Sequence, residues 1–420
     1  MGSMENSVKP HENKMGTMPM TRLILTMSLP AIFSMTIQAM YNVVDSIFIG
    51  NYDADGLTAT SLAYPLQMLL IAFAVGTAVG VNSFVSRKLG EKNFVQANDG
   101  ATHGLITCIF NYVIFLLLGL FAVRPFMAMY TQNEAILNYG IQYLTVVLCF
   151  SFFSIVQIMV EKTLQATGNM IAPMWFQIAG VVFNFVFDPL LIFGIGPFTK
   201  MGVVGAAVAT VLGYVVSTII ALIQLFLTKQ KVKPVFKNCL EPQMIKLIFS
   251  YGLPSFVMNA LGAFTVNFAN MFLVRYSDTA VAFFGAYFKV QQLIFMTVNG
   301  LIQGCLPIMR FNYRAKEYGR LKQANKSGTI IATVMMIVGM LLVLIFPKEI
   351  LFLFSASEEM CAFGVPAMRI MSLGFVFSGF SAMIATYEQA TDSIMPGVVV
   401  QLLRQGVLLV PVIKSEAKRS

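Results

Sequence analysis

Residues 183–194 place a carboxyl group within a segment that is otherwise apolar enough to lie in lipid. An ionised Asp at the centre of a bilayer costs at least about 2.5–3.5 kcal/mol, so Asp188 must be neutral, paired or directed into a wet cavity. Asn184 lies four residues earlier and shares its helical face, while Pro189 removes a backbone donor and loosens the turn behind it. These residues favour an ion or proton site over the alternative, an Asp that only hydrogen-bonds a neighbouring helix.

Two further polar residues are expected at a similar depth. With a rise of about 1.5 Å per residue, Asp45 in the first helix and Asp188 in the fifth lie roughly 7–9 Å from the outer helix ends, and Thr210 in the sixth lies about 13 Å deep. Two neighbouring carboxyl groups can share one proton, or their oxygens and those of Asn184 and Thr210 can surround Na⁺. The sequence leaves both ions open, and also an arrangement in which the two acids face different cavities. Candidates for supporting roles are Gln38, Tyr41, Asn42 and Pro189.

The composition is that of a membrane protein with many spans. Of the 420 residues, 57% are hydrophobic and 11% are charged, whereas soluble domains carry about 25% charged residues. Residues 1–21 are polar and are not expected to act as a cleavable signal peptide. The five cysteines form no CxxC pair, the few His and Cys residues suggest no hydrolytic or metal site, and there is no P-loop. We therefore expect no enzyme activity, no cofactor and no ATP binding.

Eleven apolar segments are each long enough to cross a bilayer as a helix. They run over 22–49, 57–86, 94–123, 134–166, 170–194, 201–228, 244–274, 280–309, 321–346, 360–390 and 394–413. The Lys and Arg residues gather in the N-terminal segment and in alternate loops, which the positive-inside rule assigns to the cytoplasm. The positive charge is thus explained by topology rather than by a nucleic-acid partner. We expect a multi-pass protein of the plasma membrane, in contact with lipid, with a cytoplasmic N-terminus.

The chain repeats itself when it is shifted by 224 residues. The matched elements are Leu29-Pro30 with Leu253-Pro254, Tyr52 with Tyr276, Gly76-x-x-x-Gly80 with Gly300-x-x-x-Gly304, and Gln165-Ala166-Thr167 with Gln389-Ala390-Thr391. Six helices per repeat return the chain to the same side, so the two copies have parallel topology. The predicted fold is an all-α membrane protein in two bundles. Its parts are a cytoplasmic tail 1–21, an N-lobe 22–228, a basic cytoplasmic linker 229–243, a C-lobe 244–413 and a polar tail 414–420.

The same repeat predicts a twelfth helix near 425–452, whereas the given chain ends at 420 with the polar stretch 414–420. The C-lobe would then contain five helices and lack its sixth. We expect either a truncated chain with about 11 helices, or one with an altered C-terminus, or a protein that has eleven helices by nature.

Four motifs taken together resemble the multidrug and toxic compound extrusion (MATE) transporters. They are Tyr41-Asn42-Val43-Val44-Asp45-Ser46-Ile47-Phe48-Ile49-Gly50, Gln165-Ala166-Thr167-Gly168, Asn184-x-x-x-Asp188-Pro189 and Val204-Gly205-Ala206-Ala207-x-Ala209-Thr210. The likeness covers about residues 20–413, and the loop 307–325 is similar to that of the MepA-like bacterial branch.

This resemblance implies two six-helix bundles around a V-shaped cavity and export of cationic and aromatic compounds, driven by influx of H⁺ or Na⁺. In that family an N-lobe site uses carboxylates of helices 1 and 5 with an Asn and a Thr. These roles carry over to Asp45, Asp188, Asn184 and Thr210. The segment 244–274 lacks the carboxylate that one branch has there, which argues against a second cation site. We expect a monomer that needs neither ATP nor nucleic acid.

Two alternative functions remain at this stage. A flippase for lipid-linked oligosaccharides, from the same superfamily, needs a basic cavity for pyrophosphate, whereas the buried charges of the outer half are acidic. An inactive, truncated transporter is the other alternative, and the unmatched C-terminus is its evidence.

Overall fold

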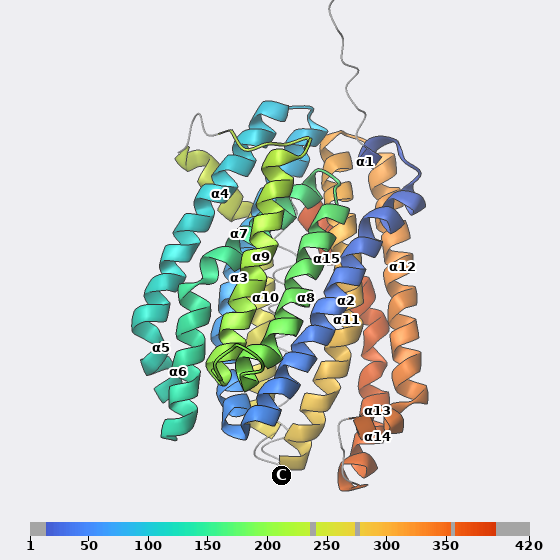
Figure 1. Cartoon of the computed structure of the whole chain (residues 1–420). Coiled ribbons are helices and arrows are strands. Elements are labelled where there is room, and N and C mark those ends of the chain that lie inside the picture. Colours follow the sequence, from blue (N-terminus) through green and yellow to red (C-terminus); the bar gives the residue numbers. More distant parts are fainter. Residues whose placement is uncertain (1–13, 236–240, 274–277, 354–357, 392–420) are drawn as a thin grey trace, which may run out of the picture.

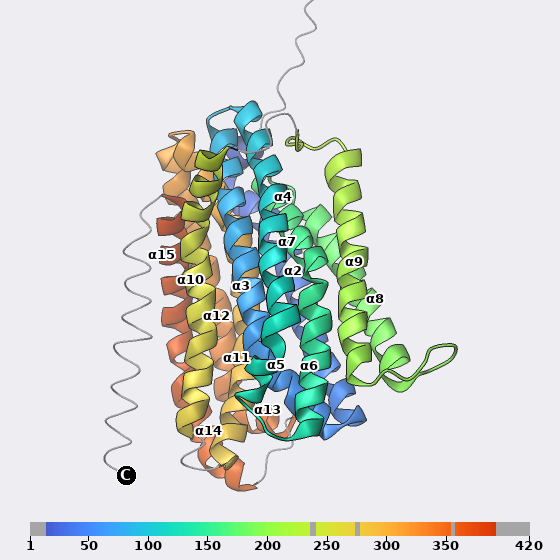
Figure 2. The same cartoon turned by 90° about the vertical axis from the view of Figure 1, so that its left-hand side faces the viewer.

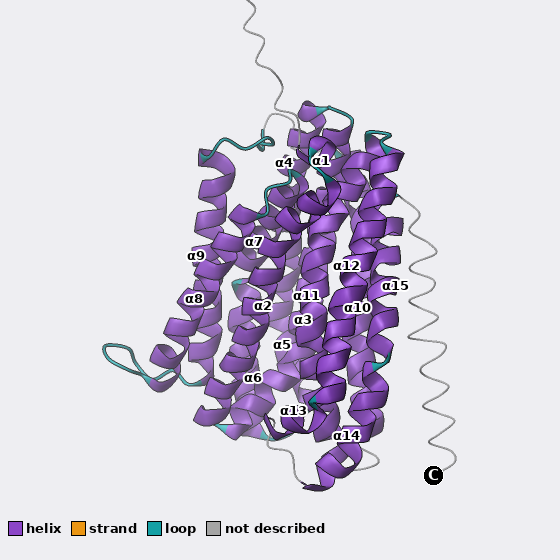
Figure 3. Ribbon diagram, turned by 90° about the vertical axis from the view of Figure 1, so that its right-hand side faces the viewer, coloured by secondary structure: helices purple, strands orange, loops and turns teal. Residues whose placement is uncertain are grey.

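The computed structural model describes residues 14–235, 241–273, 278–353 and 358–391. In this part of the chain every regular element is a helix, and there is no strand (Figure 3). The long helices lie side by side and run roughly parallel to one axis (Figure 1). The predicted all-α fold is therefore confirmed.

The N-terminal half of the bundle comprises α2 to α9, preceded by one turn of helix. Its elements are α1 (Lys14–Thr17), α2 (Met20–Tyr52), α3 (Ala54–Gly90), α4 (Phe94–Leu117), the π-helical η1 (Leu118–Ala122), α5 (Val123–Ala128), α6 (Glu134–Cys149), α7 (Ser151–Ala166), α8 (Ile171–Phe193) and α9 (Val203–Leu227). Side-chain caps start three of these helices: Asp53 begins α3, Asn93 begins α4 and Asn133 begins α6. Viewed from the side, α8 and α9 form one edge of the bundle (Figure 2).

The C-terminal half of the bundle comprises α10 to α15. Its elements are α10 (Pro242–Leu273), α11 (Asp278–Arg314), α12 (Tyr318–Ile345), α13 (Pro347–Leu353), α14 (Glu358–Ser372) and α15 (Gly374–Ala390). In Figure 2 the helices α10, α12 and α15 lie at the edge opposite α8 and α9.

Eight of the described helical segments are long and apolar enough to cross a membrane, or nine when α6 and α7, which are bent by 48°, count as one span. The first ten predicted segments coincide with described helices. Three of them are interrupted: 94–123 by the π-helical turn, 134–166 by a bend at Phe150, and 360–390 by a break at Leu373. The eleventh segment, 394–413, and the tail 414–420 lie outside the described residues.

The two halves contact each other where glycines remove side chains from the interface. A Cβ on Gly76 of α3 would lie 2.9 Å from the Cβ of Phe256 on α10. A Cβ on Gly80 would lie 3.1 Å from the backbone nitrogen of Gly252. Since real Cβ atoms hardly ever approach this closely, only glycine permits this α3–α10 contact.

The α2–α11 contact is built in the same way. A Cβ on Gly300 would lie 2.6 Å from the Cα of Ile32, and one on Gly304 would lie 2.9 Å from the Cα of Ser28. Moving every residue number by 224 converts this set into the α3–α10 set with the two halves exchanged. The interface between the halves thus has approximate two-fold symmetry.

One end of the bundle, which we call the basic end, carries α1, the α3–α4 turn and the α11–α12 turn; it is uppermost in Figure 1. Residues 1–21 were predicted to be a polar tail, but Met15 in α1 is fully buried. Its carbonyl oxygen accepts hydrogen bonds from Asn312 at 3.0 Å and Arg320 at 3.2 Å, and Arg320 also binds the carbonyl of Met18 at 2.8 Å. Helix α1 and the turn after it are therefore fastened to α11 and α12.

Candidate cation site

The acid and the amide predicted on α8, Asp188 and Asn184, lie inside the bundle. Asp188 is fully buried and Asn184 is 3% exposed. The hydroxyl of Tyr41, on α2, donates a hydrogen bond of 3.1 Å to Oδ2 of Asp188. Helix α8 continues through Pro189 to Phe193 and ends at Gly194, which adopts a left-handed conformation with φ 74°. The proline therefore sits directly after the acid without ending the helix.

The second acid lies beside the first. The carboxyl groups of Asp45 and Asp188 are close enough to interact directly, and the Tyr41 hydroxyl also lies near Asp45 and Thr210. The structure thus brings together residues from α2, α8 and α9. The arrangement in which the two acids face different cavities does not occur here.

Close packing of α8 against α9 sets this geometry. A Cβ on Gly213 of α9 would lie 2.8 Å from the carbonyl oxygen of Gly180 and 3.1 Å from the Cβ of Asn184. Because both helices carry glycine at their crossing, their backbones approach closely. This approach lets Thr210, one turn before Gly213, reach the hydroxyl of Tyr41, which bonds to Asp188.

Three buried oxygens at this site have no hydrogen-bond partner: Oδ1 of Asp45, Oδ1 of Asn184 and Oδ1 of Asp188. All three are acceptors, and an unpaired buried acceptor costs free energy. Carboxylate and amide oxygens suit a proton or a hard cation. Within the described part of the chain there is no group of three or more His, Cys, Asp or Glu residues that could hold a metal. Hard oxygen ligands of this kind suit H⁺ or Na⁺ better than a soft transition metal.

The predicted supporting residues differ in their position. Tyr41 contacts the acid directly, and Pro189 follows Asp188 in α8. Gln38 and Asn42 are exposed. Tyr41 is thus the supporting residue for which a direct bond to the acids is seen.

Sequence reasoning missed Tyr143, which lies on α6 near both Asp45 and Asp188. It is 5% exposed, and its hydroxyl accepts a hydrogen bond of 3.1 Å from Gln67 of α3. No motif or spacing connects Tyr143 with the acids, so only the fold reveals it. The site is therefore enclosed by helices α2, α3, α6, α8 and α9.

The long apolar helices of the bundle define the chain as a polytopic membrane protein. The family model MatE matches residues 30–190 and 254–413. The chain therefore belongs to the MATE family, as its motifs predicted.

The chain is similar to curated members of this family. It is 25% identical over 398 residues to the "Multidrug export protein MepA" of Staphylococcus aureus (strain MSSA476), covering 94% of this chain and 87% of that protein. The protein of the same name from Staphylococcus saprophyticus is 25% identical over 391 residues, covering 92% and 85%. The predicted MepA-like branch is confirmed.

Solved structures share the fold. An outward-facing MATE family transporter of the MOP superfamily superposes with a TM-score of 0.88 at 23% identity, over 94% of this chain and 88% of the other. A MOP superfamily transporter from Pyrococcus furiosus gives a TM-score of 0.90 at 23% identity, over 96% and 89%; its description speaks of a binding pocket of reverse polarity.

Proposed function

We propose that the protein is a secondary antiporter that exports cationic and aromatic compounds across the plasma membrane in exchange for H⁺ or Na⁺. The observation that supports this proposal is the buried pair of Asp45 and Asp188 with its unpaired oxygens. Among the described residues no ion pair to either acid is seen, and a carboxyl pair in this state attracts a cation from outside. The export activity named for the MepA relatives agrees with this chemistry.

The mechanism follows from which helices the site joins. When the acids are empty and ionised, they repel each other and attract a cationic substrate. When a proton or Na⁺ binds, the repulsion ends and α2 and α8 are held together through Tyr41 and Asp188. A coupling ion shifts a conformational equilibrium only if it binds one state more tightly. We propose that the packing of α2 against α8 differs between the two transport states and supplies this difference.

We propose the membrane orientation that the distribution of Lys and Arg predicts. The basic end faces the cytoplasm, since Lys and Arg gather there, and the protein acts as a monomer within the lipid. Phe and Met side chains form adaptable apolar walls for aromatic substrates. ATP, nucleic acid and a resident cofactor have no part in the cycle.

The deciding experiment measures ethidium efflux from vesicles under an imposed proton gradient and then under a sodium gradient. Efflux by the wild type with only one gradient identifies the coupling ion. Asp188→Asn should abolish this efflux, because the amide cannot exchange a proton and binds cations poorly. Asp99→Asn, outside the site on α4, is the matched control and should transport normally. Full gradient-driven efflux by Asp188→Asn would refute the assignment.

Thr210→Val sharpens the choice of ion. Loss of the hydroxyl oxygen should weaken Na⁺ binding strongly, because Na⁺ needs several oxygen ligands, but should affect a proton shared by two acids only slightly. If the protein were instead a flippase for lipid-linked oligosaccharides, pyrophosphate lipids rather than cationic dyes should compete for the transport site. An inactive transporter predicts no efflux by any variant despite normal insertion.

A further inference from the structure

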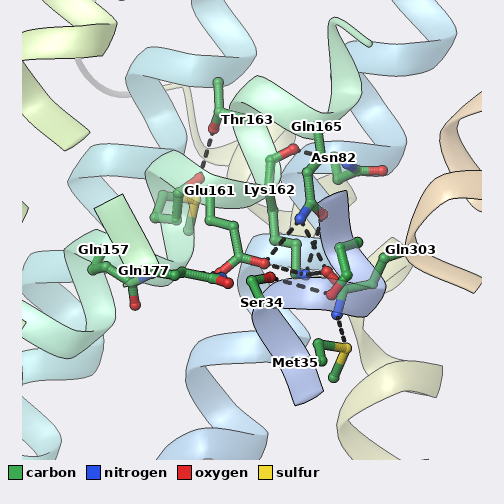
Figure 4. Close-up of polar contacts among 12 residues, drawn as sticks. Ser34, Met35, Asn82, Gln157, Glu161, Lys162, Thr163, Gln165, Gln177 and Gln303 are labelled. Atoms are coloured by element: carbon green, nitrogen blue, oxygen red, sulfur yellow. Dashed lines mark hydrogen bonds and ion pairs between the residues drawn. The ribbon is translucent and has the colours of Figure 1, made fainter. Parts of the chain in front are cut away.

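A second polar cluster lies on α7 and includes Glu161, Lys162 and Gln165 (Figure 4). Glu161 and Lys162 are adjacent in sequence and form an ion pair of 2.7 Å, with side chains 6% and 8% exposed. Buried charges are tolerated when their remaining donors and acceptors are satisfied. The Glu161 carboxylate accepts further bonds from Gln165 at 2.9 Å and from Gln177 of α8. This acid is thus neutralised and hydrogen-bonded within the protein.

The ammonium group of Lys162 also reaches the other half of the molecule. It donates a bond of 2.8 Å to Oε1 of Gln303 on α11, and Nε2 of Gln165 donates one of 2.9 Å to the same oxygen. The amide nitrogen of Gln303 contacts Sδ of Met35 on α2 at 2.9 Å. Figure 4 shows these side chains converging from three helices. One amide of the C-terminal half therefore bridges two helices of the N-terminal half.

A neighbouring bond crosses between the halves at the same level. Arg310, which is fully buried on α11, donates to Oδ1 of Asn82 on α3 at 3.1 Å. The amide nitrogen of Asn82 in turn donates to the backbone carbonyl of Lys162 at 2.8 Å. Asn82 thus links Arg310 of the C-terminal half to the helix that carries Lys162.

The cluster and the cation site share helix α8. Gln177, Asn184 and Asp188 are spaced by seven and four residues, which places them on one face of this helix. Gln177 binds Glu161 while Asp188 binds Tyr41. A rotation or bend of α8 at the cation site would therefore also move Gln177.

We propose that Lys162, Gln165 and Gln303 form a lock that holds the two halves together at the basic end, and that α8 connects this lock to the cation site through Gln177. The lock suits repeated opening, because its charges stay paired when it opens. Lys162 retains Glu161 and Gln165, and the group that leaves is a neutral amide. The connection to the cation site rests on the proposed transport function, whereas the closure itself can be tested without transport.

A native thiol reports on the closure. Cys305 lies on α11 close to Gln303, is fully buried, and packs near Ser28 of α2 in the other half. Separation of the halves at this level would expose it. Cys108 is also fully buried, but its thiol contacts the carbonyls of Gly104 and Ile155 within the N-terminal half. It should stay protected and so serves as an internal control.

The experiment uses the full chain in membrane vesicles, with Cys149, Cys239 and Cys361 replaced by Ser. N-ethylmaleimide labelling of Cys305 and Cys108 is followed by mass spectrometry. Gln303→Leu should label Cys305 roughly ten-fold faster, because loss of one charge-assisted hydrogen bond shifts an equilibrium by about that factor or more. Cys108 should label as before.

Two further variants separate the lock from general loosening. Gln389→Leu removes a half-buried amide whose bond of 2.7 Å to Ser255 stays within the C-terminal half, and it should leave Cys305 protected. Gln303→Glu places a carboxylate opposite Lys162 and should slow the labelling of Cys305 below that of wild type. Unchanged labelling in Gln303→Leu, or faster labelling of both cysteines, would overturn the proposal.

The connection through α8 has its own test. Asp188→Asn imitates a protonated acid and should change the labelling rate of Cys305 several-fold. In the Gln177→Leu background this change should disappear, while the lock residues remain in place. A change of the same size in both backgrounds would show that the lock does not receive its signal through Gln177. Since labelling requires no substrate, this outcome is independent of the efflux assay.

Discussion

The molecule contains two buried acidic sites along α8, and they are built on opposite principles. At Asp45 and Asp188 two acids lie together, and one oxygen of each has no hydrogen-bond partner. At Glu161 the acid has a lysine at 2.7 Å and amide donors around it. A carboxylate whose oxygens lack hydrogen-bond partners attracts a cation from solution. A carboxylate that is ion-paired and hydrogen-bonded within the protein can instead hold helices together. We therefore propose that the same residue chemistry gives an ion site in one place and a structural contact in the other.

The largest expected effect on stability comes from breaking the ion pair between Glu161 and Lys162. Lys162→Met leaves the Glu161 carboxylate buried without its counter-charge, which costs about 3–5 kcal/mol of unfolding free energy. Thermal unfolding in detergent, followed by size exclusion, should show a strongly reduced midpoint. Adding Glu161→Gln should restore much of the loss, because the uncompensated charge is then gone. If the double variant were as unstable as the single one, charge pairing would not explain the site.

Removing one acid from the pair of Asp45 and Asp188 should have the opposite effect on stability. Asp188→Asn removes repulsion between two acids and should leave stability unchanged or raise it by about 0.5–2 kcal/mol, as is common when a functional site is relaxed. Transport should be lost in the same variant. Thermal unfolding and ethidium efflux on one preparation check both statements. A large loss of stability here would erase the contrast between the two sites.

Disrupting one of the symmetric glycine contacts between the halves should cost less stability than Lys162→Met does. Gly304→Val on α11 would drive a side chain into the backbone of Ser28 and cost about 1–3 kcal/mol, as overpacking does. Gly285→Val on the same helix has open space around the added Cβ and is the control. Unfolding midpoints of the two variants should differ clearly.

The smallest effect is expected at Lys14, outside the membrane. Burial, and secondly the nearby charge of Lys231, lower the pKa of Lys14 from its ordinary value of 10.5. The folded state thus disfavours the charged form, so the penalty is full below the lowered pKa and fades as pH rises toward 10.5. The protection factor of the α1 amides, which corrects the exchange rate for its intrinsic base catalysis, should rise over that alkaline range in wild type. Lys14→Met should keep a high protection factor at every pH, whereas a pH dependence of this factor equal to that of wild type would contradict this account.

Much of the fold could be predicted because apolar runs of sufficient length must be helices in lipid. The sequence also allowed prediction of the site residues Asp45, Asn184, Asp188 and Thr210, because depth in the membrane and helical spacing suffice to bring them near one another. Tyr143 was not, because its approach to the acids depends on how α6 packs. The bend at Phe150 left no proline or glycine signal at that residue.

The lock illustrates a different limit. Glu161 and Lys162 are recognisable in the sequence as charged residues in an apolar segment. Their bond to Gln303 joins residues separated by 141 positions and exists only because α7 and α11 pack at one level. Polarity marks such a residue as costly, but the partner that satisfies it is a property of the three-dimensional fold.

The docking of α1 has a consequence for biosynthesis. The carbonyl of Met15 binds Asn312, 297 residues later, and Arg320, 305 residues later. A ribosome that adds about 5–20 residues per second needs roughly 15–60 s to complete that stretch. During this interval the carbonyl of Met15 lacks both of these partners. The hydrogen bonds that fasten α1 to α11 and α12 therefore form only after most of the protein has been translated.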